Sequence, residues 1–186
     1  DQNDASAHLK AIALDHANVK VEITGTSMKA AALHKIGGTT TGEVSVKELA
    51  TITGNYADMD KALVTGAGTV VLKTDKTVVT VSDAVNAAQG NAIATVGNAL
   101  AGFTTGVSDV YAKLHKDEND ASVHLKAVVA DDTDVKVEIK DAEGTVMKAA
   151  ALHKIGGSTG GDVSVTNKVS ITGDYADMQK ALVDGT

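Results

Sequence analysis

The sequence lacks several residue types whose absence narrows its chemistry. Its 186 residues include no cysteine, which excludes disulfides, thiolate zinc sites and thiol redox centres. They include no proline either, which disfavours the Pro-rich linkers that space many multidomain chains. No apolar run reaches the roughly 20 residues that a membrane-spanning helix requires, so we expect no membrane insertion.

Aromatic residues are also scarce, although the chain has enough apolar residues to form a core. Phe, Tyr and Trp make up 2% of the sequence, whereas hydrophobic residues make up 43%. The core must therefore consist of small, closely packed side chains, without the aromatic anchors of large cofactors and protein interfaces. The formal net charge of −7 argues against nucleic acid as a partner, because no basic groove is present to neutralise phosphates.

The most informative feature that is present is an internal repeat. Residues 1–66 return with small changes as residues 117–185, and residues 28–38 return unchanged as residues 147–157. Roughly two-thirds of the aligned positions are identical, which is far beyond chance and is typical of a tandem array.

The repeat divides the chain into two copies of unequal length. Residues 1–116 form a complete first copy, and residues 117–186 form a second copy that stops where the first continues through residues 67–72. The sequence begins without a methionine or a signal peptide, so we expect it to be a piece of a longer protein.

The early end of the second copy predicts an uncovered surface. In a repeat array each unit is covered by the next, so the apolar face at residues 168–183 lacks its neighbour. Exposed strand edges favour pairing with another chain. We therefore expect neighbouring repeats or identical chains to associate head to tail, with this face meeting the region around residues 9–14.

Within each copy the hydrophobic pattern indicates a shorter unit, a strand followed by a helix. Apolar and charged residues alternate at residues 19–23, as in a half-buried strand. An apolar stripe at helical spacing then runs from Met28 to Ile36 and ends at Gly37 and Gly38. The same reasoning predicts strands at residues 9–14, 44–49, 51–54, 70–73, 79–83 and 106–109, and helices at residues 56–63 and 85–96. The alternative to the strand at residues 106–109 is a mostly helical segment at residues 95–114 with a break at residues 102–106. Ser82 and Asp83 are expected to cap the helix at residues 85–96.

These units recur roughly every 29 residues, which is the size of a solenoid repeat that cannot bury its own apolar face. We therefore expect an α/β fold, arranged as an elongated array of strand-(strand)-helix units. The alternative is a tandem of immunoglobulin-like β-sandwiches with inserted helices, which would bury the same residues.

Two segments resemble a known group of proteins. Residues 51–63 and 78–93 are similar to the tandem repeats of very large secreted bacterial surface proteins, including cyanobacterial giant repeat proteins and adhesin-like chains. The resemblance implies a structural role outside the cell or in its envelope. The glycine-aspartate nonapeptide that binds calcium in toxin-type repeats is missing here.

The histidines are interpreted as structural. His34 and His153 lie three residues before a glycine that ends a predicted helix, where a histidine interacts with the helix C-terminus. Neither has a second histidine or a cysteine at ligand spacing. His8 and His124 fall on a strand pattern beside lysines, which is typical of a solvated face.

Acidic residues gather in two places and are the only metal candidates. Hard cations such as calcium require several oxygen ligands at once. The spacing fits no EF-hand, and His16 and Asn18 in the first copy replace two of the acids. We therefore interpret them as solvated turns and expect no cofactor, with calcium as the alternative. The candidate residues are Asp117, Asn119, Asp120, Asp131, Asp132 and Asp134.

No motif for catalysis is present, so we do not expect an enzyme. The serines lack the glycine-flanked turn of a hydrolase, and no carboxylate pair stands apart from the turn acids. The sequence therefore predicts a structural repeat module of an extracellular or cell-surface protein, acting as a spacer or as a self-assembling filament or layer element. The alternative is an adhesin-type module that binds glycan, mineral or calcium.

Overall fold

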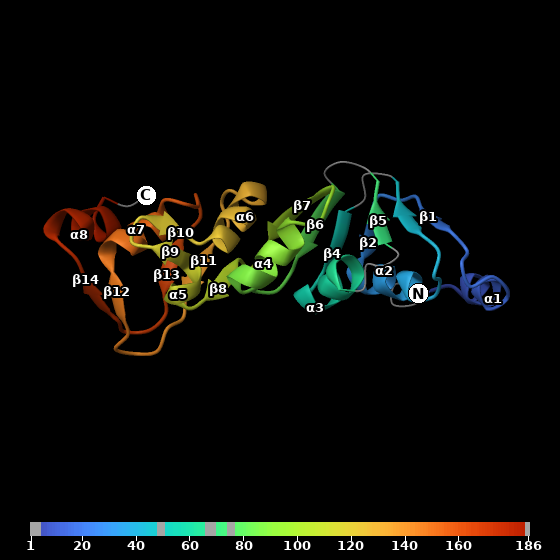
Figure 1. Ribbon diagram of the computed structural model, residues 1–186, viewed down its shortest axis with the longest axis horizontal. Helices are drawn as coiled ribbons and strands as arrows, with labels where there is room; N and C mark the ends of the chain where they lie inside the picture. The colour runs from blue at the N-terminus through green and yellow to red at the C-terminus, as the bar shows by residue number, and fades with distance from the viewer. Residues whose placement is uncertain (1–4, 48–50, 66–69, 74–76, 185–186) are drawn as a thin grey trace. The chain divides into compact units, whose positions relative to one another are not determined.

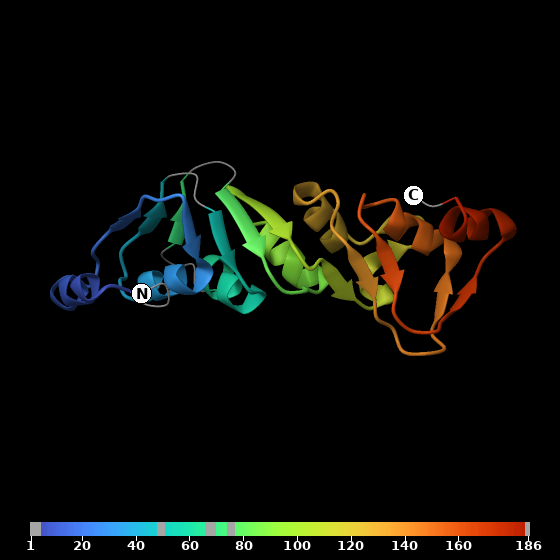
Figure 2. The same ribbon diagram turned by 180° about the vertical axis from the view of Figure 1, so that it is seen from behind.

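The computed structural model describes residues 5–47, 51–65, 70–73 and 77–184, and shows the predicted mixed α/β fold with parallel sheets (Figures 1 and 2). The chain forms two compact units. The first comprises Asp1–Asp83 and Ala92–Gly102, and the second comprises Ala84–Asn91 and Phe103–Thr186. Immunoglobulin-like sandwiches, the alternative, are wrong for the described residues, because a sandwich needs antiparallel sheets and these pair mostly in parallel.

Two sheets build the first unit. In one, β1 pairs with β3 and β3 with β5, all in parallel. In the other, β2 pairs with β4 and β4 with β6, again in parallel, and β7 lies beside β6. Helices α2 and α3 lie side by side along the strands (Figure 1). The elements are α1 (Ala7–Asp15), β1 (Val21–Ile23), β2 (Ser27–Lys29), α2 (Ala30–Gly37), β3 (Val44–Val46), β4 (Thr51–Gly54), α3 (Tyr56–Met59), the π-helix η1 (Asp60–Val64), β5 (Val70–Leu72) and β6 (Thr77–Val81).

Helix α4 (Ala87–Ala94) and strand β7 (Ala99–Phe103) contain residues of both units. The second unit has a parallel sheet in the order β13-β11-β8 and a parallel pair, β12 with β14. Helices α7 and α8 pack against each other (Figure 2). Its elements are β8 (Val107–Asp109), α5 (Tyr111–Leu114), β9 (His115–Asp117), β10 (Asp120–Ala121), α6 (Val123–Asp131), β11 (Val137–Ile139), β12 (Val146–Lys148), α7 (Ala149–Gly156), β13 (Val163–Val165), β14 (Ser170–Thr172) and α8 (Tyr175–Leu182).

Most of the parallel pairs join strands that recur after one strand–strand–helix repeat, as β2, β4 and β6 do. We call one such repeat a turn. Met28 of β2 lies opposite Ile52 of β4, and Ile52 lies opposite Val79 of β6, so apolar side chains stack on apolar side chains. Intervals of roughly 25 residues match the size of solenoid repeats. The continuation of such turns into one elongated array along the whole chain stays a prediction.

Small residues allow helix and strand to approach closely inside a turn. Ala30 at the start of α2 is fully buried, and a Cβ added at Gly54 of β4 would lie 3.0 Å from the Cβ of Ala30. Around this contact, Leu33, Ile52 and Met59 are also fully buried. The core therefore consists of aliphatic and small side chains, as the scarcity of aromatic residues predicts.

A buried threonine holds adjacent turns together at one corner. The Thr40 hydroxyl donates to the carbonyl oxygens of Ala17 and Val19, at 3.0 and 2.6 Å, and accepts from the Gly42 N–H at 2.9 Å. In the second copy, Thr159 contacts the carbonyl oxygen of Val135 at 2.7 Å in the same way. The hydroxyl satisfies carbonyls that the corner would otherwise leave without partners.

Two segments that we predicted as strands are helices. Residues 9–14 belong to α1, which begins where the Ser6 hydroxyl oxygen accepts a hydrogen bond from the Leu9 N–H at 3.1 Å. Ser122 caps α6 through the Leu125 N–H in the same way, at 3.2 Å. His8 and His124 therefore lie on helices and not on strands. A serine cap before residues with good helix propensity outweighed the weak alternation.

Residues 95–114 are not mostly helical, so that alternative is wrong, and the predicted strand at residues 106–109 is β8. The segment contains β7, β8 and the short helix α5, with Asn98 and Gly106 at positive φ in the connections. Ser82 and Asp83 do not cap α4. Instead, Asn86 Oδ1 accepts from the Gln89 N–H and Gln89 Oε1 accepts from the Asn86 N–H, which is a reciprocal capping box. The predicted strand at residues 44–49 is β3 up to Val46, and its end at residues 48–49 lies outside the described residues.

Gly42, two residues after Thr40, should be required for the approach of adjacent turns. A Cβ at Gly42 would collide with the carbonyl oxygens of Asn18 and Val19, whereas a Cβ at Gly25 meets nothing within 4 Å. We expect Gly42→Ala to lower the free energy of unfolding by about 1–3 kcal/mol. Gly25→Ala should leave it nearly unchanged. Urea denaturation of both variants tests this, and equal losses would contradict the close approach.

Candidate functional site

The two sequence copies place the same residue types in different surroundings. At the start of the copies, Ile12 is 50% exposed, whereas its counterpart Val128 is fully buried. Val21 and Ile23 of β1 are half-buried, whereas their counterparts in β11 are buried. The cause is a neighbouring strand, since β11 lies between β8 and β13 while β1 pairs only with β3 in the described part of the chain. We call Ile12, Val21, Ile23 and Met28 the N-terminal face.

At the end of the copies the difference is reversed. Val46 is fully buried and Leu63 is 6% exposed, whereas their counterparts Val165 and Leu182 are 37% and 57% exposed. Strand β3 lies between β1 and β5, and β4 between β2 and β6. Among the described residues, β13 has only β11 beside it, and β14 only β12. We call Val163, Val165, Ile171, Tyr175 and Leu182 the C-terminal face.

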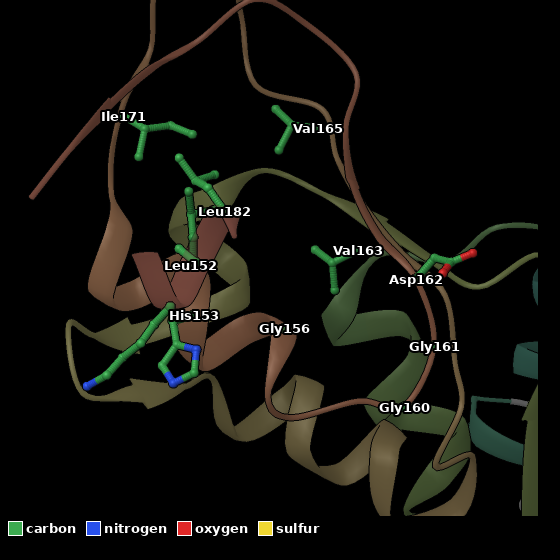
Figure 3. Close-up of a pocket in the computed structure, with 12 residues that line it drawn as sticks. Leu152, His153, Gly156, Gly160, Gly161, Asp162, Val163, Val165, Ile171 and Leu182 are labelled. Carbon is green, nitrogen blue, oxygen red and sulfur yellow. The ribbon is translucent and has the colours of Figure 1, made fainter. Parts of the chain in front are cut away.

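A cavity of about 330 Å³ opens at the C-terminal face. Figure 3 shows Ile171 and Val165 on opposite sides of it, with Leu182 and Leu152 between them. These side chains correspond to core residues of the first copy, so the cavity is the interior of a turn that no further turn covers within the part of the chain that the structure describes. Asp162 lies at the edge of the same cavity (Figure 3).

The N-terminal face has a corresponding cavity, of about 420 Å³, lined by Met28, Lys29 and Ala32 among others. In the second copy Tyr111 occupies the equivalent place. Its hydroxyl accepts a hydrogen bond from the Lys148 N–H at 3.1 Å, and burial raises the pKa of that hydroxyl. Tyr111 is a residue that the sequence analysis missed, because no local pattern marks its contact with the distant Lys148.

Aspartates of one turn also cap the helices of the turn before. The N–H of Tyr56, at the start of α3, donates to Asp83 Oδ1 at 2.6 Å. Two further helix starts receive the same contact from the turn that follows: Ala87 N–H donates to Asp109 Oδ2 at 3.0 Å, and Tyr111 N–H donates to Asp141 Oδ2 at 2.5 Å. A carboxylate at this place satisfies a free N–H and favours the positive end of the helix. In the sequence, the feature that could have indicated these caps is an aspartate at the end of a predicted strand, as at Asp83 and Asp109.

The helix at the C-terminal face lacks this cap in the described residues. Tyr175 begins α8 as Tyr56 begins α3, but Tyr175 is 82% exposed and no carboxylate of a following turn reaches it. The helix keeps only its local cap, in which Asp174 Oδ1 accepts from the Asp177 N–H at 2.9 Å.

The first group of metal candidates is held by local contacts. Asp117 Oδ1 accepts from the Asn119 N–H at 2.8 Å. Asp120 forms an ion pair with Lys126 at 2.5 Å, and the hydrogen bond from Lys126 lowers the pKa of this exposed carboxyl. These are local contacts of the kind found in solvated turns and short strands, and none of them gathers several oxygen ligands around one point.

The second group follows α6. Asp131 is the last residue of that helix, and Asp132 Oδ2 accepts from the Phe103 N–H at 2.7 Å. Burial raises the pKa of Asp132 above the usual range, and the neighbouring carboxylate of Asp134 raises it further, against the lowering effect of the Phe103 N–H. Within residues 5–47, 51–65, 70–73 and 77–184, no three histidines or acids form a group that could hold a metal. Calcium binding stays an untested alternative.

The histidines at the helix ends lie where we predicted them. His34 and His153 occupy the last turns of α2 and α7. His153 Nδ1 is buried without a hydrogen-bond partner, beside the cavity of the C-terminal face. Among the described residues, His153 belongs to no group of three or more side chains that could hold a metal.

Comparison with known proteins finds no relative: no family model, no curated protein and no solved structure matches this chain. Among the described residues, no helix is long and apolar enough to cross a membrane. The two faces are therefore the features from which a function can be inferred.

The repeat offers a matched test of the two faces. We expect Val137→Ala and Val44→Ala, at buried positions, each to lower the free energy of unfolding by about 2 kcal/mol. The counterparts Val21→Ala and Val163→Ala, at half-buried positions, should cost less than half as much. Denaturation at low protein concentration measures all four. If Val21→Ala cost as much as Val137→Ala, and Val163→Ala as much as Val44→Ala, the two faces would be covered in solution, which would contradict this account.

The raised pKa of Asp132 predicts a pH dependence. A carboxyl with a raised pKa stabilises the fold below its unfolded pKa of about 4, and this contribution is lost as the pH rises through the folded pKa. Asp132→Asn keeps an oxygen for the Phe103 N–H but cannot titrate. We expect its melting temperature to change less than that of the original chain from acid to neutral pH. Asp132→Ala, which also loses the acceptor, is the control, and identical pH profiles for all three proteins would contradict this account.

Proposed function

We propose that this chain is a structural repeat module of an extracellular or cell-surface protein, acting as a spacer or as a self-assembling filament or layer element. Each module supplies one uncovered face at its start and another at its end. Its partners are neighbouring repeats or identical chains, joined head to tail. The role is mechanical and architectural, with no catalytic step.

The change in burial between the two copies carries this proposal. The same valine and isoleucine positions are buried where a strand of the next turn is present and exposed where it is absent. Side chains that serve as core in one copy are therefore the surface of the other. Such surfaces are typical of repeats whose stability depends on nearest neighbours.

The geometry of the strands favours a head-to-tail joint. Strand β13 has its open edge on the side away from β11, and β1 has its open edge on the side away from β3. A strand added at either edge in the direction of the existing sheet would continue the parallel pairing. Because residues 9–14 form part of helix α1, the strand that would continue the sheet at the C-terminal face of another chain is β1.

The location outside the cell rests on two weaker supports. The absence of cysteine is compatible with secretion by an organism that does not rely on disulfides. The resemblance of residues 51–63 and 78–93 to repeats of secreted surface proteins points to the same place.

Sedimentation velocity over a range of protein concentrations tests the head-to-tail joint. We expect the original chain to form larger species as its concentration rises. Val165→Asp blocks the C-terminal face and Ile23→Asp blocks the N-terminal face, because each puts a charge into an apolar contact. Each variant alone should stay monomeric. A mixture of the two should form dimers and nothing larger, because each variant retains one intact and complementary face.

Val146→Asp is the control, since Val146 is exposed on β12 outside both faces and its change should leave association intact. A strictly monomeric original chain at high concentration would contradict the self-assembly. Failure of the mixture to form dimers would contradict the head-to-tail arrangement.

A further inference from the structure

We propose that the C-terminal face is an acceptor site whose preferred occupant is a two-strand segment with the sequence of residues 70–83, as a following repeat would supply it, and that this segment competes there with strand β1 of another chain. This inference rests on the proposed function and specifies what the C-terminal face recognises. The acceptor binds the segment by parallel strand addition, by one ion pair and by one helix cap.

The first copy shows the acceptor in its occupied state. There β5 adds to β3, with Val70 opposite Val44 and Leu72 opposite Val46. Strand β6 adds to β4, with Val79 opposite Ile52. Both added strands are well packed: Val70 is 8% exposed, Leu72 is 4% exposed, and Val79 is fully buried. Strands β5 and β6 therefore cover the strands β3 and β4 of their own unit.

The second copy repeats the acceptor residues without change. Val44, Val46, Ile52, Tyr56 and Leu63 correspond to Val163, Val165, Ile171, Tyr175 and Leu182. The cavity of about 330 Å³ at the C-terminal face lies among four of these counterparts (Figure 3). The same side chains should therefore accept the same strands, in the register of the first copy.

Charge complementarity supports the same register. In the first unit Lys73, directly after β5, forms an ion pair with Glu43 at 3.0 Å. The counterpart of Glu43 is Asp162, an exposed carboxylate at the edge of the cavity (Figure 3). A segment with Lys73 in the same register would place its ammonium group beside Asp162.

The aspartate at the end of the segment completes the site. Asp83 caps α3 through the Tyr56 N–H at 2.6 Å, and the equivalent N–H on α8 belongs to Tyr175. An aspartate carboxylate beside the Tyr175 N–H would contribute to binding in addition to the open strand edges and the cavity. This helix cap gives the site a preference for a strand pair that ends in aspartate.

A synthetic peptide of residues 69–84, labelled with a fluorophore, tests the proposal on the intact chain. We expect saturable binding by fluorescence anisotropy, with one peptide per chain, and slower hydrogen exchange in β13 and β14. A peptide of scrambled sequence should not bind. Val165→Asp in the protein should abolish binding, whereas Ile23→Asp at the N-terminal face should leave it unchanged. Absence of saturable binding, or binding that survives Val165→Asp, would overturn the proposal.

A double-variant cycle tests the helix cap. The peptide with Asp83→Ala should bind about fivefold more weakly, as expected for loss of a helix cap. Tyr175→Pro in the protein removes the N–H donor at a helix position that tolerates proline, while Tyr175→Ala keeps it. With Tyr175→Pro the two peptides should bind equally, and with Tyr175→Ala they should still differ. An unchanged difference in the proline variant would overturn the cap, and thermal melting of both variants verifies that they fold.

The same samples separate this inference from the proposed function. If the chains associate head to tail but the peptide does not bind, the inference about the occupant is wrong and the module function stands. If the peptide binds and the chains stay monomeric, the acceptor site stands and the self-assembly is wrong. If both are correct, excess peptide should shift associated chains toward monomers, because it occupies the C-terminal face.

Discussion

The structure depends on one constraint: a single strand–strand–helix turn is too small to bury its own apolar side. Burial requires a second turn whose strands lie in register on the first. In the first unit β3 and β4 receive β5 and β6, and their apolar residues are buried. The equivalent strands β13 and β14 have nothing beyond them among the described residues, and their side chains are partly exposed. Most of the apolar burial that stabilises the fold is therefore expected between neighbouring turns and not within a single turn.

Polar contacts between turns explain how the register is kept. Hydrophobic stacking alone is tolerant of small shifts, because neighbouring valines and isoleucines resemble one another. Thr40 and Thr159 bond to backbone oxygens of the adjoining turn, and Asp83, Asp109 and Asp141 bond to helix N–H groups of the turn before. Each of these bonds needs one particular alignment. At the C-terminal face these polar contacts are missing among the described residues, so the helix N–H group of Tyr175 and the apolar side chains are both available for binding. This combination defines the proposed acceptor site.

Local signals explain which parts of the fold could be read from the sequence. The strands at β1, β4 and β6 and the end of α2 at its glycines followed from alternation and helix stops. Residues 9–14 could be read as strand or helix, and only the serine cap at Ser6 decided between them. Tyr111 could not be identified from local signals, because its contact with Lys148 joins residues distant in sequence.

The sequence by itself determined the internal repeat, the α/β class and the small-residue core. These follow from composition and from local patterns, which do not depend on distant contacts. Only the tertiary structure decided which copy of an identical segment is core and which is surface. Val44 and Val163 are the same residue in the same motif, and they differ because one strand has a neighbour on both sides and the other has a neighbour on one. Burial is a property of the assembled turns, so it cannot be assigned to a residue from its local sequence.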